Sequence, residues 1–300
     1  MMLEGKVYVV AGGGHGIGEA TAVHLGSHGG TVVVNDLGTD LAGEGESSEP
    51  ASETAEAVRE AGGEAMAHFG DISSLEYTEE LVADVVEEYG RVDGAVNFAG
   101  VLADAISYKM TGEEWDRVIR VHLRGHFALL RALAAHWRDR AGPDGDALDA
   151  QRSFVGISSG AAGTPSFGQL NYASAKAGIL GLVRTAAVEL DRYNVRANAI
   201  WPSAYTRMVE EMPEEHRPDE EAVPDPEDIA PVVAYLMSDH AEDITGCTIR
   251  AAGDVVGLVS DPEVQRTGFK EGGWTVGDLA THFEDDVAQG WDLHRSDPPI

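Results

Sequence analysis

Short apolar runs alternate with longer segments of helical composition along most of the chain, and this rhythm constrains the fold most strongly. The apolar runs are continuous, without in/out alternation, and cover 6–12, 31–36, 64–73, 92–100, 153–159, 195–202 and 246–253. The helical segments between and around them cover 19–29, 51–63, 75–90, 113–138, 171–193 and 226–239. Continuous apolar strands separated by helices indicate a parallel sheet that is covered on both faces. The sequence therefore predicts an α/β fold, a doubly wound (Rossmann), mostly seven-stranded parallel sheet.

The end of the chain has a different character. A chain of 300 residues, 43% of them hydrophobic, can bury one large core. Residues 261–300 carry scattered aromatic side chains and an amphipathic stretch, with no further strand pattern. We therefore expect residues 1–260 to form the sheet domain and residues 261–300 to form a C-terminal extension packed on that core.

The net charge is extreme and acidic. The 52 acidic residues outnumber the 21 basic ones, which leaves a formal charge of −31. Such a surface repels phosphate, so we expect no nucleic-acid partner. Two interpretations of the acidity remain open. One is an ordinary acidic, solvated surface, and the other, which we favour, is a halophilic protein whose self-repulsion is screened by high salt.

Cysteine and hydropathy patterns bear on the compartment. Cys247 is the single cysteine, which leaves no internal disulfide framework and fits a reducing cytoplasm. The N-terminal apolar run is too short for a signal peptide, and no segment is long enough to span a membrane. We therefore expect a cytoplasmic protein without a membrane partner.

Two histidine pairs have helical i, i+4 spacing, His24/His28 and His122/His126, but neither has a convincing third ligand, so we expect no metal site.

A glycine-rich turn joins the first strand to the first helix. Gly12, Gly16 and Gly18 form a G-x-x-x-G-x-G pattern, which lets the backbone approach a pyrophosphate at the helix N-terminus. Asp36 ends the second strand, where a carboxylate can bind the ribose hydroxyls of adenosine and repel a 2′-phosphate. No lysine or arginine stands in either segment. The pattern predicts NAD as the cofactor, although Asp36 can also be a plain turn residue.

A tyrosine and a lysine stand one helical turn apart further along the chain. Tyr172 and Lys176 share a helix face, and Lys176 is one of only four lysines. An ammonium group beside a phenol stabilises the phenolate, so we expect Lys176 to lower the pKa of Tyr172. Ser159 ends the fifth strand, at the sheet edge where ligands bind. A serine hydroxyl there can donate to a carbonyl oxygen while Tyr172 delivers or takes a proton.

These motifs together resemble the short-chain dehydrogenase/reductase family over about residues 4–257. Within it, the segments 32–38, 120–127 and 166–182 are most similar to the (3R)-hydroxyacyl-CoA dehydrogenase portion of peroxisomal multifunctional enzyme type 2. The resemblance implies that Tyr172 is the acid/base, that Lys176 also holds the nicotinamide ribose and that Ser159 polarises the carbonyl. It also implies further contacts to the cofactor, from His15, Ile17, Asp71, Ile72, Asn97, Ala99, Gly100, Pro202 and Thr206.

The chain departs from the family pattern at several positions. Phe98 stands where a second asparagine is usual, and Ser203 stands where a glycine is usual. His122 aligns with the fourth catalytic position, commonly asparagine, which leaves the proton-relay role of that position open. We expect residues 102–112 and 203–222 to build the substrate pocket.

Three functions remain open from the sequence. The leading hypothesis is an NAD-dependent dehydrogenase of a secondary alcohol, a 3-hydroxyacyl thioester in particular. A second is a 3-oxoacyl carrier reductase or an alcohol/steroid dehydrogenase on the same scaffold. A third is an NAD-binding protein without catalysis, against which the intact Ser159, Tyr172 and Lys176 argue. From the family we expect a homodimer or homotetramer acting on a small-molecule substrate.

Overall fold

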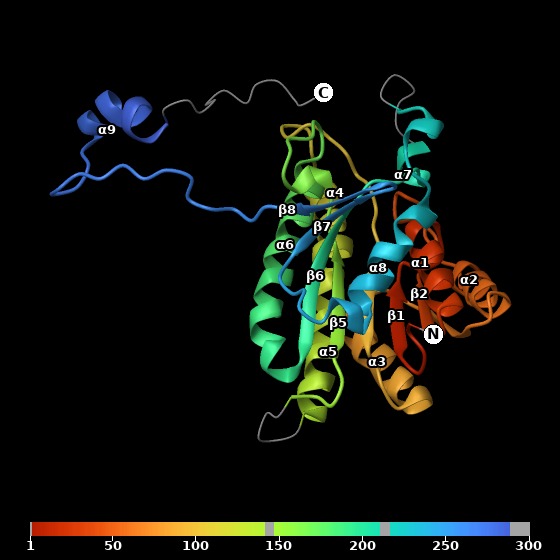
Figure 1. Cartoon of the computed structure of the whole chain (residues 1–300). Helices are drawn as coiled ribbons and strands as arrows, with labels where there is room; N and C mark the ends of the chain where they lie inside the picture. The colour runs from red at the N-terminus through yellow and green to blue at the C-terminus, as the bar shows by residue number, and fades with distance from the viewer. Residues whose placement is uncertain (1, 142–146, 211–216, 289–300) are drawn as a thin grey trace. The chain divides into compact units, whose positions relative to one another are not determined.

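The predicted sheet is present in the computed structural model, which describes residues 2–141, 147–210 and 217–288 (Figure 1). Its described strands lie in the order β3-β2-β1-β4-β5-β6-β7-β8. Their bounds are β1 Val7–Ala11, β2 Thr31–Asp36, β3 Glu64–Phe69, β4 Gly94–Asn97, β5 Arg152–Ile157, β6 Val195–Pro202, β7 Thr248–Ala252 and β8 Val255–Val259. The strands from β1 to β7 pair in parallel, which confirms the doubly wound fold.

The eighth strand is a correction to the predicted seven. β8 runs antiparallel to β7, with Ala252 opposite Val255, so the hairpin turn is the two residues Gly253 and Asp254. A two-residue turn with glycine is a recognised hairpin signal. We missed it because β8 follows β7 after only two residues, with no helix between them, so it breaks the alternation of strands and helices on which the prediction rested.

Two separate apolar cores explain how the sheet holds its helices. Alternate residues of β1 point to opposite faces: Val7 and Val9 join one core, while Tyr8 and Val10 join the other. The first core receives side chains from α3 (Leu75–Tyr89), α5 (Gly125–Arg140) and α6 (Leu170–Leu190). The second receives them from α1 (Gly16–Ser27), α2 (Glu49–Glu60) and α8 (Ala230–Met237). In the described ranges, none of the helices is long and apolar enough to cross a bilayer.

The helix predicted over 113–138 is interrupted. It consists of α4 (Gly112–Val118), a π-helical segment (Ile119–Arg124) and α5, which follow one another directly. A capping box of Thr111 and Glu114 starts α4. π-Helical turns inside α-helices frequently occur at functional sites. This one contains His122.

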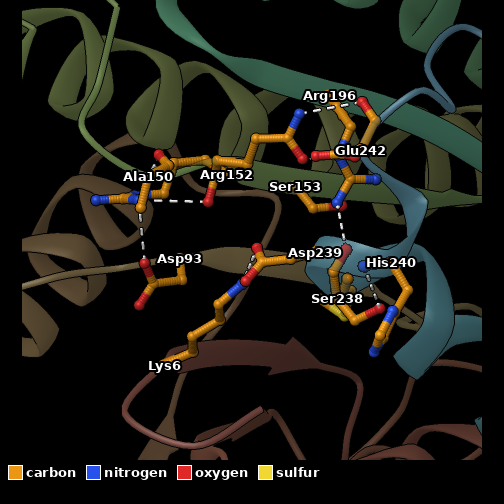
Figure 2. A network of polar contacts seen from close by, with 12 residues as sticks. Lys6, Asp93, Ala150, Arg152, Ser153, Arg196, Ser238, Asp239, His240 and Glu242 are labelled. Carbon is orange, nitrogen blue, oxygen red and sulfur yellow. Dashed lines mark hydrogen bonds and ion pairs between the residues drawn. The ribbon is translucent and has the colours of Figure 1, made fainter. Parts of the chain in front are cut away.

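The amino ends of the strands are tied together by charged side chains (Figure 2). Asp93, which precedes β4, accepts hydrogen bonds from the Val7 amide at 2.9 Å and from both ends of the Arg91 guanidinium at 2.7 Å. Arg152 of β5 lies 3.2 Å from the same carboxylate. Arg196 of β6 donates to the carbonyl oxygens of Leu236 and Ser238 at the end of α8. This network lies at the opposite edge of the sheet from the carboxyl ends of the strands.

The chain divides into two compact units, Met1–Val259 and Ser260–Ile300. The described part of the second unit contains α9 (Val276–His282), which a capping box of Thr275 and Asp278 starts. Gly268 lies against Trp274 and Val287 within this unit. That residues 261–300 pack on the sheet domain stays a prediction.

Candidate active site

A cavity of about 440 Å³ opens at the carboxyl ends of the strands, with β1 and β4 among the strands that reach it. The strand order reverses between these two strands, and ligands of doubly wound sheets bind at that point. All but one of the predicted site residues line the cavity: Gly12, His15, Gly16, Ile17, Gly18, Asp36, Asp71, Ile72, Ala99, Gly100, His122, Ser159, Tyr172, Lys176, Pro202 and Thr206. The tertiary structure therefore brings the two predicted motifs into one cavity.

Asn97 is the exception. It is fully buried at the end of β4, where its Oδ1 accepts the Ala99 amide at 2.9 Å. We expected Asn97 to line the cofactor floor, and instead it supports the turn that does. Its Nδ2 lies 3.4 Å from His126 Nδ1 of α5, so the side chain is enclosed by protein while the turn after it faces the cavity.

Two glycines let the turn between β1 and α1 pack directly against neighbouring backbone. Gly12 has φ +64°, and a Cβ there would lie 2.2 Å from the Ala99 amide nitrogen. A Cβ at Gly18 would lie 2.1 Å from the Gly12 carbonyl oxygen. Only glycine fits at these two positions without moving the backbone. The tight turn at the start of α1 therefore fits a dinucleotide pyrophosphate.

Asp36 has a structural role as well as the predicted one. Its two carboxylate oxygens accept the Gly14 amide at 2.8 Å and the Gly38 amide at 2.7 Å. Each oxygen keeps a further lone pair, so the carboxylate can still accept ribose hydroxyls. Asp71 is also engaged, since it accepts the Ser73 amide and lies 2.7 Å from Arg120 Nη1.

Two arginines of the cavity were missed by sequence reasoning. Arg117 and Arg120 line it from α4 and the π-helical segment, and Arg117 donates to the Ala42 carbonyl oxygen in the loop after β2. We searched for basic residues only near the glycine turn and Asp36, whereas these lie about eighty positions further along the chain. The described lining contains Arg117, Arg120, Lys176 and Arg207 against Asp36, Asp40 and Asp71. The cavity is thus far less acidic than the chain, which suits an anionic ligand.

Ser159, Tyr172 and Lys176 converge on the same wall of the cavity. Ser159 follows β5 and hydrogen-bonds with the Tyr172 hydroxyl. Lys176 lies one turn along α6, with Nζ 5.4 Å from the centre of the Tyr172 ring. Lys176 Nζ also donates to the Ile157 carbonyl oxygen at 2.9 Å. The phenol oxygen is therefore held by a hydroxyl on one side, with an amine close to the ring.

The protonation chemistry of this pair differs from our expectation. Burial raises the pKa of Tyr172, the hydrogen bond with Ser159 acts in the opposite direction, and Asp104 adds to the increase. Burial also lowers the pKa of Lys176 to about 7. The expected lowering at Tyr172 was wrong for the protein alone, because removal from water outweighs the charge of an amine that itself loses its proton easily.

His122 packs directly against Tyr172. Its ring meets the Tyr172 ring edge to face, with 5.2 Å between centres and 88° between planes. Its Nε2 lies 3.1 Å from the Val101 amide and 2.9 Å from the Val101 carbonyl oxygen. Burial, followed by the charge of Lys176, holds the pKa of His122 well below its usual range. His122 therefore supports Tyr172 as a neutral ring.

Of the two segments predicted to build the substrate pocket, one lines the cavity and the other does not. Ser203, Ala204, Arg207, Met208, Val209 and Pro218 line the cavity, and residues 211–216 lie outside the described residues. The segment 102–112 is not part of this lining. Its Ala105 pairs with Gln169 instead, and Gln169 donates to Asp104 at 2.9 Å. Of the two predicted segments, only the one after β6 therefore contributes to the described lining.

The two histidine pairs make ring and backbone contacts in the structure. The rings of His24 and His28 stack with centres 4.4 Å apart. His126 donates from Nδ1 to the His122 carbonyl oxygen at 2.7 Å. Within the described ranges, no cluster of three or more histidine, cysteine or acidic residues is arranged to hold a metal ion.

Comparisons with known proteins identify relatives that are described as dehydrogenases or reductases. Residues 11–253 match a family model described as enoyl-(acyl carrier protein) reductase. The chain is 40% identical to hydroxyacyl-CoA dehydrogenase ChsB1 of Mycobacterium tuberculosis over 288 residues, 94% of this chain and 89% of that protein. It is 37% identical to peroxisomal multifunctional enzyme type 2 of Mus musculus over 248 residues, 82% of this chain and 31% of that longer protein. The crystal structure of a short-chain dehydrogenase from Mycobacterium avium superposes with a TM-score of 0.83 at 33% identity, and covers 100% of this chain and 98% of that one.

Proposed function

The chain belongs to the short-chain dehydrogenase/reductase family, and from that membership we propose that it transfers a hydride between NAD and a 3-hydroxyacyl thioester. It is an oxidoreductase that acts on CH–OH groups. The observation that carries the proposal is the convergence of Ser159, Tyr172 and Lys176 in the cavity that also contains the glycine turn. A proton-transfer group and a dinucleotide-binding turn in one cavity are what hydride transfer to or from a carbonyl requires.

The residues divide the work of the reaction. NAD, when bound along the glycine turn, supplies the hydride acceptor. Tyr172 takes the hydroxyl proton during oxidation and returns it during reduction. Ser159 donates a hydrogen bond to the substrate oxygen, which stabilises the charge that develops there. Lys176 Nζ is held in place by the Ile157 carbonyl oxygen, 5.4 Å from the centre of the Tyr172 ring.

The name of one relative supports an acyl thioester as the substrate. The M. tuberculosis relative is named as a hydroxyacyl-CoA dehydrogenase, and the near-neutral cavity is compatible with an anionic carrier. Absorbance at the reduced-nicotinamide band tests the proposal with a panel of 3-hydroxyacyl-CoA thioesters, 3-oxoacyl carrier-protein substrates, simple alcohols and steroids. We expect the CoA thioesters to turn over fastest. Preference for the carrier-protein substrates would favour the second candidate, and no turnover of any substrate would contradict both.

We expect NADH to bind at least about tenfold more tightly than NADPH, a difference of about 1.4 kcal/mol. The Asp36 carboxylate repels a 2′-phosphate at this position. Isothermal titration with both reduced cofactors measures the ratio, and Asp36→Asn should bring the two affinities closer together. Asp40→Asn is the matched control, since Asp40 lines the same cavity beyond the strand end. Equal binding of the two cofactors to the wild type would contradict NAD preference.

We also propose that the acidity is an adaptation to high salt. The formal charge of −31 destabilises the compact state by self-repulsion, and the Debye length shrinks from about 10 Å at 0.1 M to about 3 Å at 1 M salt. The melting temperature should therefore rise by several degrees between dilute buffer and molar sodium chloride. Sucrose, which does not screen charge, should raise it less. A melting temperature that stays flat across the salt series would contradict this adaptation.

The family also supports a homodimer or homotetramer, and the single cysteine supports a cytoplasmic location. Tyr235, Val256 and Leu258 are exposed around an apolar groove between α8 and β8, which fits a self-association surface. Light scattering at several protein concentrations measures the mass in solution.

A further inference from the structure

His126 is fully buried, and both of its ring nitrogens are engaged. The residue lies in the first turn of α5 and has 0% exposure. Its Nδ1 donates to the His122 carbonyl oxygen at 2.7 Å, and its Nε2 accepts the Ile157 amide at 3.0 Å. These two bonds assign the neutral tautomer with the proton on Nδ1. Burial and the charge of Lys176 lower the pKa of His126 to about 3, so the ring stays neutral.

Ile157, which donates to His126, also binds the proposed catalytic lysine, Lys176. β4 ends at Asn97, which pairs with Gly156, so Ile157 of β5 extends one residue beyond β4. The backbone groups of Ile157 therefore bond to side chains. His126 accepts from the Ile157 amide, and Lys176 donates to the Ile157 carbonyl oxygen at 2.9 Å. The position of Lys176 Nζ therefore depends on where His126 holds the end of β5.

The His122 end of the contact holds the ring that packs on Tyr172. The bond from His126 reaches the His122 carbonyl oxygen inside the π-helical segment, and the His122 ring meets Tyr172 edge to face. A single side chain thus connects the supports of two catalytic residues. It does so from behind the cavity, since His126 is absent from the cavity lining.

We propose that His126 is a positioning residue, which sets Lys176 through Ile157 and Tyr172 through His122. Histidine suits this place because a rigid neutral ring presents a donor and an acceptor on different edges. Asparagine can replace only the Nδ1 donor, glutamine only the Nε2 acceptor, and leucine neither. The inference rests on the proposed function, because the two positioned residues are those of the proposed hydride-transfer site.

Lysine titration tests the inference without a substrate. The chain has four lysines, Lys6, Lys109, Lys176 and Lys270, so protein labelled with ¹³C at lysine Cε yields few signals. Lys176 is identified by its loss in Lys176→Arg. In the wild type we expect Lys176 to titrate near 7. His126→Leu should raise that midpoint by about one pH unit or more, because the freed amine reaches water. His126→Gln should keep it, since the acceptor for Ile157 remains.

Turnover provides the second measurement. His126→Leu should lower kcat by about 10²-fold, the cost of a misplacement of about 1 Å, with a smaller loss in His126→Gln. His136→Leu, on the same helix and away from the cavity, is the matched control and should leave both the titration and kcat unchanged. If His126→Leu fails to fold, His126→Asn takes its place, and it should shift the Lys176 midpoint where His126→Gln does not.

The outcomes separate the two proposals. An unchanged Lys176 midpoint in His126→Leu, or an equal shift in the glutamine and leucine variants, would overturn the positioning role. Absence of turnover by the wild-type protein would contradict the proposed function, while the lysine titration would still report on His126.

Discussion

Replacing Tyr172 with phenylalanine should lower turnover by about 10²–10⁴-fold while NAD(H) binding survives. The variant loses only the phenol oxygen, so the ring still packs edge to face against His122. The variant lacks the oxygen that we propose takes the hydroxyl proton beside Ser159 and Lys176. Steady-state kinetics on the best substrate of the panel measures the loss in kcat.

Two controls make this result specific to proton transfer. NADH fluorescence titration should show an affinity close to that of the wild type, because the glycine turn and Asp36 are untouched. Tyr193→Phe, a change of the same size just after α6, should keep full turnover. Near-normal turnover of Tyr172→Phe would refute the assignment of the acid/base residue.

Replacing Asp93 with alanine should cost about 3–5 kcal/mol of unfolding free energy. The Asp93 side chain is only 1% exposed, accepts hydrogen bonds from Val7 and Arg91, and forms an ion pair with Arg152. Without it, the Arg152 guanidinium stays buried with less compensation, and the Val7 amide loses its acceptor. Urea denaturation followed by far-ultraviolet circular dichroism measures the change.

Figure 2 also contains the matched control for this prediction. Lys6 and Asp239 form an ion pair in which the Asp239 side chain is 67% exposed. Solvent screens such a pair, so Asp239→Asn should cost less than about 1 kcal/mol. The double variant Asp93→Ala/Arg152→Met should recover part of the loss, because it removes the buried charge as well. A loss below 1 kcal/mol for Asp93→Ala alone would contradict the role of this carboxylate.

Much of the fold was predictable because strands buried on both faces have a one-dimensional signature. Continuous apolar runs located β1 to β7, and helical composition located the long helices. β8 was missed because a hairpin joins it directly to β7, outside the alternation of strands and helices. The interruption at Ile119–Arg124 was missed because a π-helical turn changes the hydrogen bonds of a helix without changing its composition.

The candidate site was predictable where its residues belong to short motifs. The glycine turn, Ser159, Tyr172 and Lys176 were identified from spacing, and the structure places them in one cavity. Arg117 was not identified and His126 was considered only as a possible metal ligand, since their partners, Ala42 and Ile157, lie far from them in the sequence. No spacing rule connects such residues.

By itself, the sequence determined the alternation of strands and helices, the turn that suits a dinucleotide and the spacing of the reactive side chains. These are properties of neighbouring residues, so local geometry is sufficient to predict them. Only the tertiary structure decided the pKa values of the site residues and the hydrogen bonds that hold these residues in place. The pKa of Tyr172 rises because surrounding elements remove the phenol from water. From the sequence we expected the opposite direction, because Lys176 lies one helical turn away. Burial and hydrogen-bond partners depend on which distant segments meet, and that is established only when the chain folds.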